Sequence, residues 1–219
     1  MTSKLTTGGP LKLVIFGATG LIGRPLLEQA LAAGHDVTVL VRTPSAITTT
    51  HERLHVVAGE VTKAEDVARA LEGAEAAITT IGPRAKQPPG TLISDATRNI
   101  IAGMKQHGGK RLVFTSGLIM ADGQGIAWFR RIGIAIFRAL NGALYRDKLI
   151  AEPLVKDSGL DWVTVRPPAI DGGKARGTYR IGEHLGIRLD TMSANDVAKA
   201  LLDQVVDATY VHKAVEISY

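Results

Sequence analysis

The sequence contains no cysteine. Disulfide bonds, thiolate metal sites and cysteine nucleophiles are therefore excluded, and any chemistry must come from other side chains or from a bound cofactor. No uncharged apolar run approaches the roughly 20 residues that a membrane-spanning helix needs, so we expect no membrane span. Residues 1–10 lack the apolar core of a secretory signal, so they are expected to be a disordered lead-in to a cytoplasmic protein.

The chain also lacks any dense run of charge of one sign. Its 26 Lys and Arg residues outnumber its 21 Asp and Glu residues, which gives a net charge of +5 that is spread along the sequence. Such a surplus suits a small anionic ligand, whereas a nucleic-acid partner is not indicated. With 219 residues, 45% of them hydrophobic, the chain is expected to form one domain over residues 11–219.

A metal site is not expected, although the letters of a zinc-protease motif are present. The run His51-Glu52-Arg53-Leu54-His55 matches H-E-x-x-H. That motif holds zinc only on a helix, where both histidines share one face. Here the run leads into HVVAG, which is typical of a strand, and no third ligand follows at a helical spacing. We therefore predict that this segment binds no metal.

The most informative stretch is Leu11 to Gly23, LKLVIFGATGLIG, in which an apolar strand is followed by a glycine turn and an apolar helical run. Gly17 allows a sharp turn off the strand, Gly20 allows a pyrophosphate to approach the backbone, and Gly23 allows close packing of the helix. The alternative is a purely structural corner, which a glycine turn alone does not exclude. The strand before it and the helix after it favour a dinucleotide site.

No acidic residue ends the second predicted strand, Asp36–Val41. Sites for NAD place Asp or Glu there to bind the ribose 2′-hydroxyl, whereas this chain has Arg42 followed by Thr43. A cation beside a hydroxyl fits a 2′-phosphate, so NADPH is favoured over NADH, and Arg24 adds to that charge. The alternative is that Arg42 is a solvated surface residue.

Strands and helices alternate along most of the chain. Further strands are predicted at 55–58, 74–80, 111–115, 162–166 and 211–218, and helices at 21–33, 64–71, 94–107, 145–156 and 193–206. This alternation predicts an α/β fold with a doubly wound parallel sheet, in which ligands bind at the carboxyl ends of the strands. The residues expected at that edge are Gly17, Arg42, Gly59, Gly82 and Ser116.

Residues 118–144 interrupt this alternation with an apolar insert that carries Trp128, Phe129 and Phe137 beside arginines. Four interpretations stay open: a lid over the acceptor, an oligomer contact, a membrane-surface contact, or a helix buried in its own domain.

Five segments resemble one family. They are GATGLIG at 17–23, VLVR ending at Arg42, TSG at 115–117, SGLDWVTVRPP at 158–168 and SANDVAKAL at 193–201. The chain resembles the atypical short-chain dehydrogenases with an NmrA-like NAD(P)-binding domain, and within them the biliverdin-IXβ reductase/flavin reductase branch. That branch has a histidine after the double proline where this chain has Ala169. This departure weakens the expectation of a tetrapyrrole substrate more than the expectation of reductase chemistry.

The resemblance implies a Rossmann-like domain with a small C-terminal substrate-side portion. Together with the residues already argued, it gives this expected cofactor site: Gly17, Thr19, Gly20, Leu21, Ile22, Gly23, Arg24, Arg42, Glu60, Val61, Thr80, Ile81, Gly82, Thr115, Pro168 and Ile170. In the family an aspartate is commoner at the position of Glu60. The expected acceptor side comprises Ser116, Trp128 and Ala169.

The Tyr-x-x-x-Lys pair of typical short-chain dehydrogenases is missing, because Tyr145 is followed by lysine at three residues, not four. A flat conjugated acceptor does not need that pair, since its own ring accepts hydride and solvent supplies the proton. We therefore expect an NADPH-dependent reductase of a flavin, quinone or tetrapyrrole, with Ser116 as the candidate catalytic residue. The alternative is a non-catalytic NADP(H)-binding redox sensor of the NmrA-like type, with the apolar insert as its partner surface.

Overall fold

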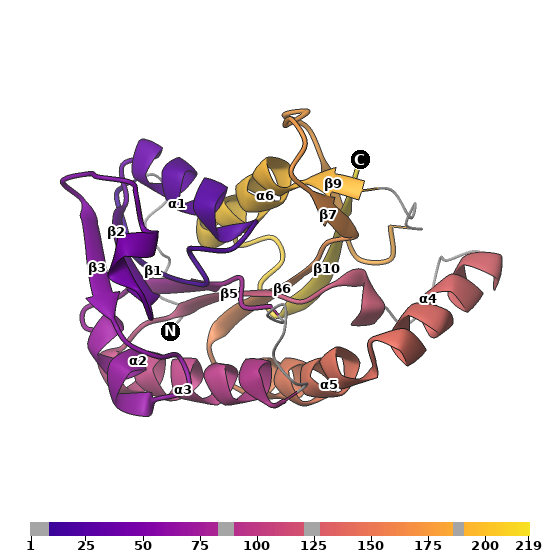
Figure 1. The fold of residues 1–219 in the computed structure, drawn as a ribbon, viewed down its shortest axis with the longest axis horizontal. Helices are drawn as coiled ribbons and strands as arrows, with labels where there is room; N and C mark the ends of the chain where they lie inside the picture. Colours follow the sequence, from indigo (N-terminus) through magenta and orange to yellow (C-terminus); the bar gives the residue numbers. More distant parts are fainter. Residues whose placement is uncertain (1–8, 83–89, 121–127, 186–190) are drawn as a thin grey trace.

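The computed structural model describes residues 9–82, 90–120, 128–185 and 191–219. The expected disordered lead-in therefore lies outside the described residues, except for its last two positions. Figure 1 shows a central layer of strands with helices on both of its faces, as the alternation of strands and helices predicts.

The central sheet has eight strands in the order β3-β2-β1-β4-β5-β6-β10-β8, and all neighbours are parallel except the edge pair β10 and β8. The doubly wound parallel sheet is thus confirmed. The strands are β1 (Lys12–Phe16), β2 (Asp36–Val41), β3 (Leu54–Ala58), β4 (Ala76–Thr79), β5 (Arg111–Thr115), β6 (Asp161–Arg166), β8 (Arg180–Gly182) and β10 (Lys213–Ser218).

Helices cover both faces of the sheet because the side chains of its inner strands are apolar on both faces. In β1, Leu13 and Ile15 belong to one buried cluster, whereas Val14 and Phe16 belong to the other. Helices α1 and α6 pack together on one face, and α2, α3 and α5 lie side by side on the other (Figure 1). Their bounds are α1 (Gly23–Ala32), α2 (Ala64–Ala70), α3 (Leu92–His107), α5 (Gly142–Lys156) and α6 (Ala194–Val206).

A small second sheet was not expected from the sequence. It pairs β7 (Ala169–Asp171) with β9 (Thr191–Ser193) in parallel, and each strand is too short to give a periodic signal. β9 leads directly into α6, where the Ser193 hydroxyl accepts a hydrogen bond from the Asp196 backbone N–H. Ser193 is therefore the N-cap of this helix.

The described residues of the segment 118–144 belong to three helical elements. A short 3₁₀ turn, η2 (Leu118–Met120), follows β5, and α4 (Trp128–Leu140) leads into α5, which begins three residues before the expected Tyr145. In Figure 1, α4 extends away from the end of the sheet. The interpretation of the segment as a wholly buried helix is wrong, because the side chains of Ile132 and Ile136 are more than half exposed.

Candidate functional site

A cavity of about 400 Å³ opens at the carboxyl ends of β1 to β4, the edge that the sequence singles out. Its lining residues are Phe16, Gly17, Ala18, Thr19, Gly20, Leu21, Ile22, Leu40, Val41, Arg42, Gly59, Val61, Thr80, Ile81, Gly82, Leu92 and Ile170. The structure therefore brings most of the expected cofactor residues together. Those outside the lining are Gly23, Arg24, Glu60, Thr115 and Pro168.

Two of the three motif glycines are required by the protein's own packing. Gly17 has φ +92°, and a Cβ there would lie 2.7 Å from the hydroxyl of Thr80 on the neighbouring strand end. A Cβ on Gly23 would overlap the carbonyl oxygen of Gly17 and lie 2.7 Å from the Cα of Ala18. A side chain at Gly23 would force the helix away from the glycine turn, whereas a side chain at Gly17 would clash with Thr80.

Gly20 is different, because little of the protein crowds it. A Cβ there would meet only the carbonyl oxygen of Gly17, at 3.2 Å, and Gly20 itself lines the cavity. The following helix begins without a side-chain cap and without an acidic residue in its first turn. An open backbone surface beside an uncapped, acid-free helix N-terminus fits a diphosphate, so the residues present suit a dinucleotide.

The two arginines expected near the 2′-phosphate lie differently. Arg42 is exposed at the rim of the cavity and forms no ion pair with a carboxylate of the described residues. Arg24 donates from Nε to the carbonyl oxygen of Thr19 over 3.1 Å, which ties the first turn of α1 to the glycine turn. Arg42 therefore has its charge available to a ligand, whereas Arg24 also has a structural contact.

The wall after β3 is built around a carboxylate. Asp66 accepts a hydrogen bond from the Glu60 backbone N–H at 2.9 Å and another from Arg69 at 2.7 Å. The backbone hydrogen bond is the main reason why the pKa of Asp66 lies below its ordinary value. Glu60 itself is exposed and does not line the cavity, whereas Gly59 and Val61 on either side of it do. His55 lies in β3, so the two histidines of H-E-x-x-H do not share a helix.

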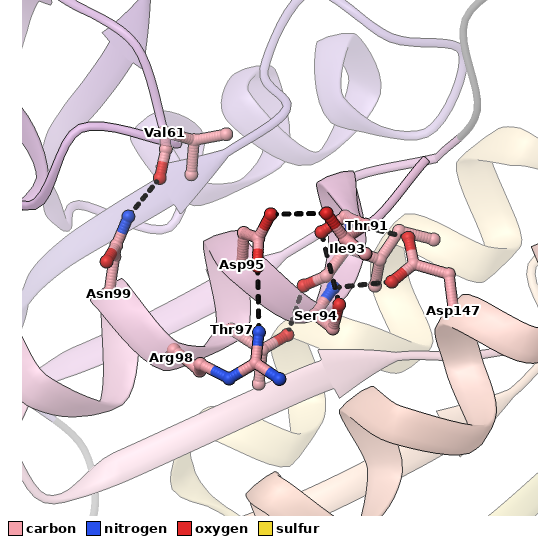
Figure 2. A network of polar contacts seen from close by, with 9 residues as sticks. All are labelled: Val61, Thr91, Ile93, Ser94, Asp95, Thr97, Arg98, Asn99 and Asp147. Atoms are coloured by element: carbon pink, nitrogen blue, oxygen red, sulfur yellow. Dashed lines mark hydrogen bonds and ion pairs between the residues drawn. The ribbon is translucent and has the colours of Figure 1, made fainter. Parts of the chain in front are cut away.

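The wall after β4 is secured from two sides. The Thr80 hydroxyl donates to the carbonyl oxygen of Phe16 at 3.1 Å. Leu92, at the N-terminus of α3, also lines the cavity. Asp147 of α5 caps this helix end, because its carboxylate accepts hydrogen bonds from the backbone N–H groups of Ile93 (2.7 Å) and Ser94 (2.9 Å) (Figure 2). Neither Leu92 nor Asp147 was predicted. A cap supplied from another helix leaves no local sequence pattern.

Ser116 follows β5, which pairs with β4, and its backbone is fixed by a hydrogen bond from its N–H to the carbonyl oxygen of Val165 at 2.8 Å. The hydroxyl oxygens of Ser116 and Thr115 are both buried and have no hydrogen-bond partner among the described residues. Buried polar atoms are nearly always paired in folded proteins. Neither Thr115 nor Ser116 lines the cavity, so contact of these hydroxyls with a ligand stays a prediction.

The structure adds a residue that the sequence argument missed. Lys148 is only 6% exposed, and its ammonium donates to the carbonyl oxygen of Ser116 over 2.5 Å. Burial lowers the pKa of Lys148 to about 8, against the smaller opposing influence of Glu152 and Asp147. A pattern was available, because Lys148, Ala151 and Val155 share one buried face at helical spacing. A lysine on such a face is unusual enough to mark a site.

The expected acceptor side is only partly assembled. Ile170 lines the cavity, whereas Pro168 is buried and Ala169 is exposed. Trp128 is the first residue of α4, and none of the described residues that line the cavity comes from that helix. A lid role for α4 therefore stays a prediction.

This arrangement defines a dinucleotide-binding α/β protein, and comparison with known proteins gives the family. Residues 17–208 match the NAD(P)H-binding family model, so the chain belongs to that family. One relative is a 3-beta-hydroxysteroid dehydrogenase from Mycolicibacterium neoaurum, 27% identical over 74% of this chain. The chain spans about half of that protein, 48% of its length.

Solved structures share the fold. An anaerobilin reductase from Escherichia coli O157:H7 is 23% identical, with a TM-score of 0.76 over 94% of this chain and 96% of the reductase. A short-chain dehydrogenase/reductase from Veillonella parvula, solved in complex with NADP, is 17% identical, with a TM-score of 0.76 over 95% of this chain and 94% of that protein. Both likenesses show the Rossmann-like fold.

Proposed function

We propose that this protein is an NADPH-dependent reductase of a flat conjugated acceptor, such as a flavin, a quinone or a tetrapyrrole. The observation that carries the proposal is the pairing of a cavity lined by the glycine turn with a buried lysine at the next strand end. The cavity contains the glycine turn and Arg42, and Lys148 binds the carbonyl of Ser116 just beyond β5. The solved anaerobilin reductase supports a tetrapyrrole as one member of this acceptor class.

In this proposal, the residues of the cavity bind the cofactor. Backbone groups of Thr19 to Ile22 would hold the diphosphate, because they lie at the uncapped start of α1. Arg42 would bind the 2′-phosphate, and Thr80 to Gly82 would line the nicotinamide side. When bound, the reduced nicotinamide supplies the hydride.

In this proposal, Ser116 and Lys148 assist the transfer of hydride to the acceptor. The buried ammonium would stabilise negative charge that develops on the acceptor and would hold a proton close to the site, because a pKa of about 8 keeps it mostly protonated at neutral pH. The unpaired Ser116 hydroxyl would orient the acceptor or the carboxamide. This refines the expectation that solvent alone supplies the proton.

Steady-state oxidation of NADPH with a panel of flavins, quinones and tetrapyrroles tests the proposal. We expect turnover with at least one of these acceptors and little with simple aldehydes or ketones, because no Tyr-x-x-x-Lys pair is present. Reduction of the acceptor should be followed directly by its absorbance, so that NADPH oxidase activity with oxygen is not counted.

A redox sensor is the alternative, and it predicts binding without turnover. The exposed apolar residues of α4 favour it as a second candidate, because a sensor needs a surface for a partner. Tight NADPH binding together with no turnover across the whole panel would favour the sensor over the reductase.

A further inference from the structure

Helix α4 has its apolar face turned outward. Ile132, Ile136 and Leu140 follow one another at four-residue intervals and therefore share one face, yet they are 51%, 56% and 79% exposed. The guanidinium of Arg138 lies instead over the ring of Tyr145 on α5, 4.9 Å from its centroid. A surface helix normally packs its apolar stripe against the protein, so these three residues lack the cover that such a stripe usually has.

The composition of α4 indicates what covers that face. Three of its thirteen residues are arginine and none is acidic, and the whole chain carries a net charge of +5. An apolar stripe on a helix whose only charges are positive is complementary to a surface that is apolar inside and anionic outside. Figure 1 shows α4 extending beyond the sheet, where it can meet such a surface.

A second copy of the chain suits this face less well. A helix of thirteen residues is about 20 Å long and about 10 Å wide, so one face offers a few hundred square ångströms at most. A stable dimer buries roughly 800 Å² on each partner. Packing two α4 helices face to face would also bring two arginine-rich, acid-free helices together.

We propose that α4 docks this protein on the surface of an anionic lipid bilayer. The helix lies in the plane of the interface, with Ile132, Ile136 and Leu140 at the boundary between headgroups and acyl chains. The attachment is peripheral, because no helix of the described residues is long and apolar enough to cross a membrane. It requires neither a bound cofactor nor an acceptor, so it stands independently of the proposed reductase activity.

Co-sedimentation of the full chain with vesicles tests the proposal. We expect binding to vesicles of phosphatidylcholine mixed with phosphatidylglycerol, weaker binding to phosphatidylcholine alone, and a loss of binding at high salt. The double variant Ile132→Glu/Ile136→Glu should bind the mixed vesicles about tenfold more weakly or worse. The single variant Ile136→Glu has a matched control in Val206→Glu, which places the same charge on another exposed apolar residue, at the end of α6.

Circular dichroism and NADPH affinity check that the variants fold. Absence of binding to the mixed vesicles, or equal binding by the double variant and the unmodified protein, would overturn the proposal. So would a concentration-dependent dimer in analytical ultracentrifugation that the double variant dissociates, because the face would then be an interface between two copies of the chain.

Discussion

The ammonium of Lys148 donates a hydrogen bond to the backbone carbonyl of Ser116, and this contact joins the middle of α5 to the end of β5. The two residues are 32 positions apart in the sequence. Both are buried, so the contact places a positive charge where water has little access. A charge in such a place interacts strongly with any charge that develops beside it, which gives Lys148 a testable part in the proposed reaction.

Replacing Lys148 should impair chemistry more than cofactor binding. We expect Lys148→Met to lower kcat/KM for a flavin or quinone about ten- to a hundredfold, because the charge that stabilises the reduced acceptor is lost. Lys156→Met on the same helix is the matched control, since Lys156 is exposed. Steady-state kinetics and NADPH titration separate the two effects. An equal loss of activity in both variants would contradict the role given to Lys148.

The pKa of Lys148 predicts a pH dependence of stability. Burial lowers this pKa from 10.5 to about 8, so between these values the unfolded chain holds a proton that the folded chain has released. Stability should therefore rise from pH 8 to 10.5 relative to Lys148→Met, by on the order of 3 kcal/mol. Below pH 8 both states are protonated, and the difference should be flat. Urea unfolding of both proteins across this range measures it; parallel curves would show that the pKa is not lowered.

Ser116 should matter for activity but not for stability. Its hydroxyl has no partner among the described residues, so Ser116→Ala removes no internal hydrogen bond and should leave the unfolding free energy unchanged or slightly raised. We expect kcat/KM to fall about three- to thirtyfold, since one hydrogen bond to the ligand is lost. NADPH affinity should change little. A loss of more than about a thousandfold would make Ser116 an acid–base residue.

Arg42 should decide between NADPH and NADH. Because it lies exposed at the cavity rim with no carboxylate partner among the described residues, NADPH should bind at least about tenfold more tightly than NADH. Arg42→Glu should reverse this preference, because it replaces attraction with repulsion. Lys105→Glu, on the exposed side of α3, makes the same change of charge away from the cavity and should preserve the preference. Equal dissociation constants in the unmodified protein would disprove the assignment.

The parts of the fold that follow from local demands could be predicted from the sequence. The glycine turn is one, because the backbone at Gly17 and the close approach at Gly23 exclude every side chain. The buried strands are another: Asp36–Val41 and Arg111–Thr115 have the bounds that their apolar, β-branched runs predict. In both cases the signal lies within a few consecutive residues.

The rest of the site depends on contacts between distant segments. Lys148 meets Ser116 only after α5 packs against the sheet, and the missing Tyr-x-x-x-Lys pattern gave no reason to place this lysine there. The strands β7 and β9 have three residues each, too few for a periodic signal. The outward orientation of α4 is also invisible in the sequence, because its amphipathic pattern predicts a buried stripe.

The cap that Asp147 provides should be a large local contribution to stability. Its buried carboxylate accepts from two backbone N–H groups at the start of α3 (Figure 2), so Asp147→Ala would leave both donors unpaired and should cost about 2–4 kcal/mol. Asp147→Asn keeps one acceptor oxygen and should recover part of this loss. Asp95→Ala is the control, because Asp95 lies in the same helical turn but pairs with Arg98 at the surface. Its loss should lower the free energy of unfolding by under about 1 kcal/mol.

Since Leu92 lines the cavity at this helix end, Asp147→Ala should also weaken NADPH binding, whereas Asp95→Ala should not. Urea unfolding and NADPH titration of the three variants measure both effects, and similar losses for Asp147→Ala and Asp95→Ala would show that the cap does not hold the cavity wall.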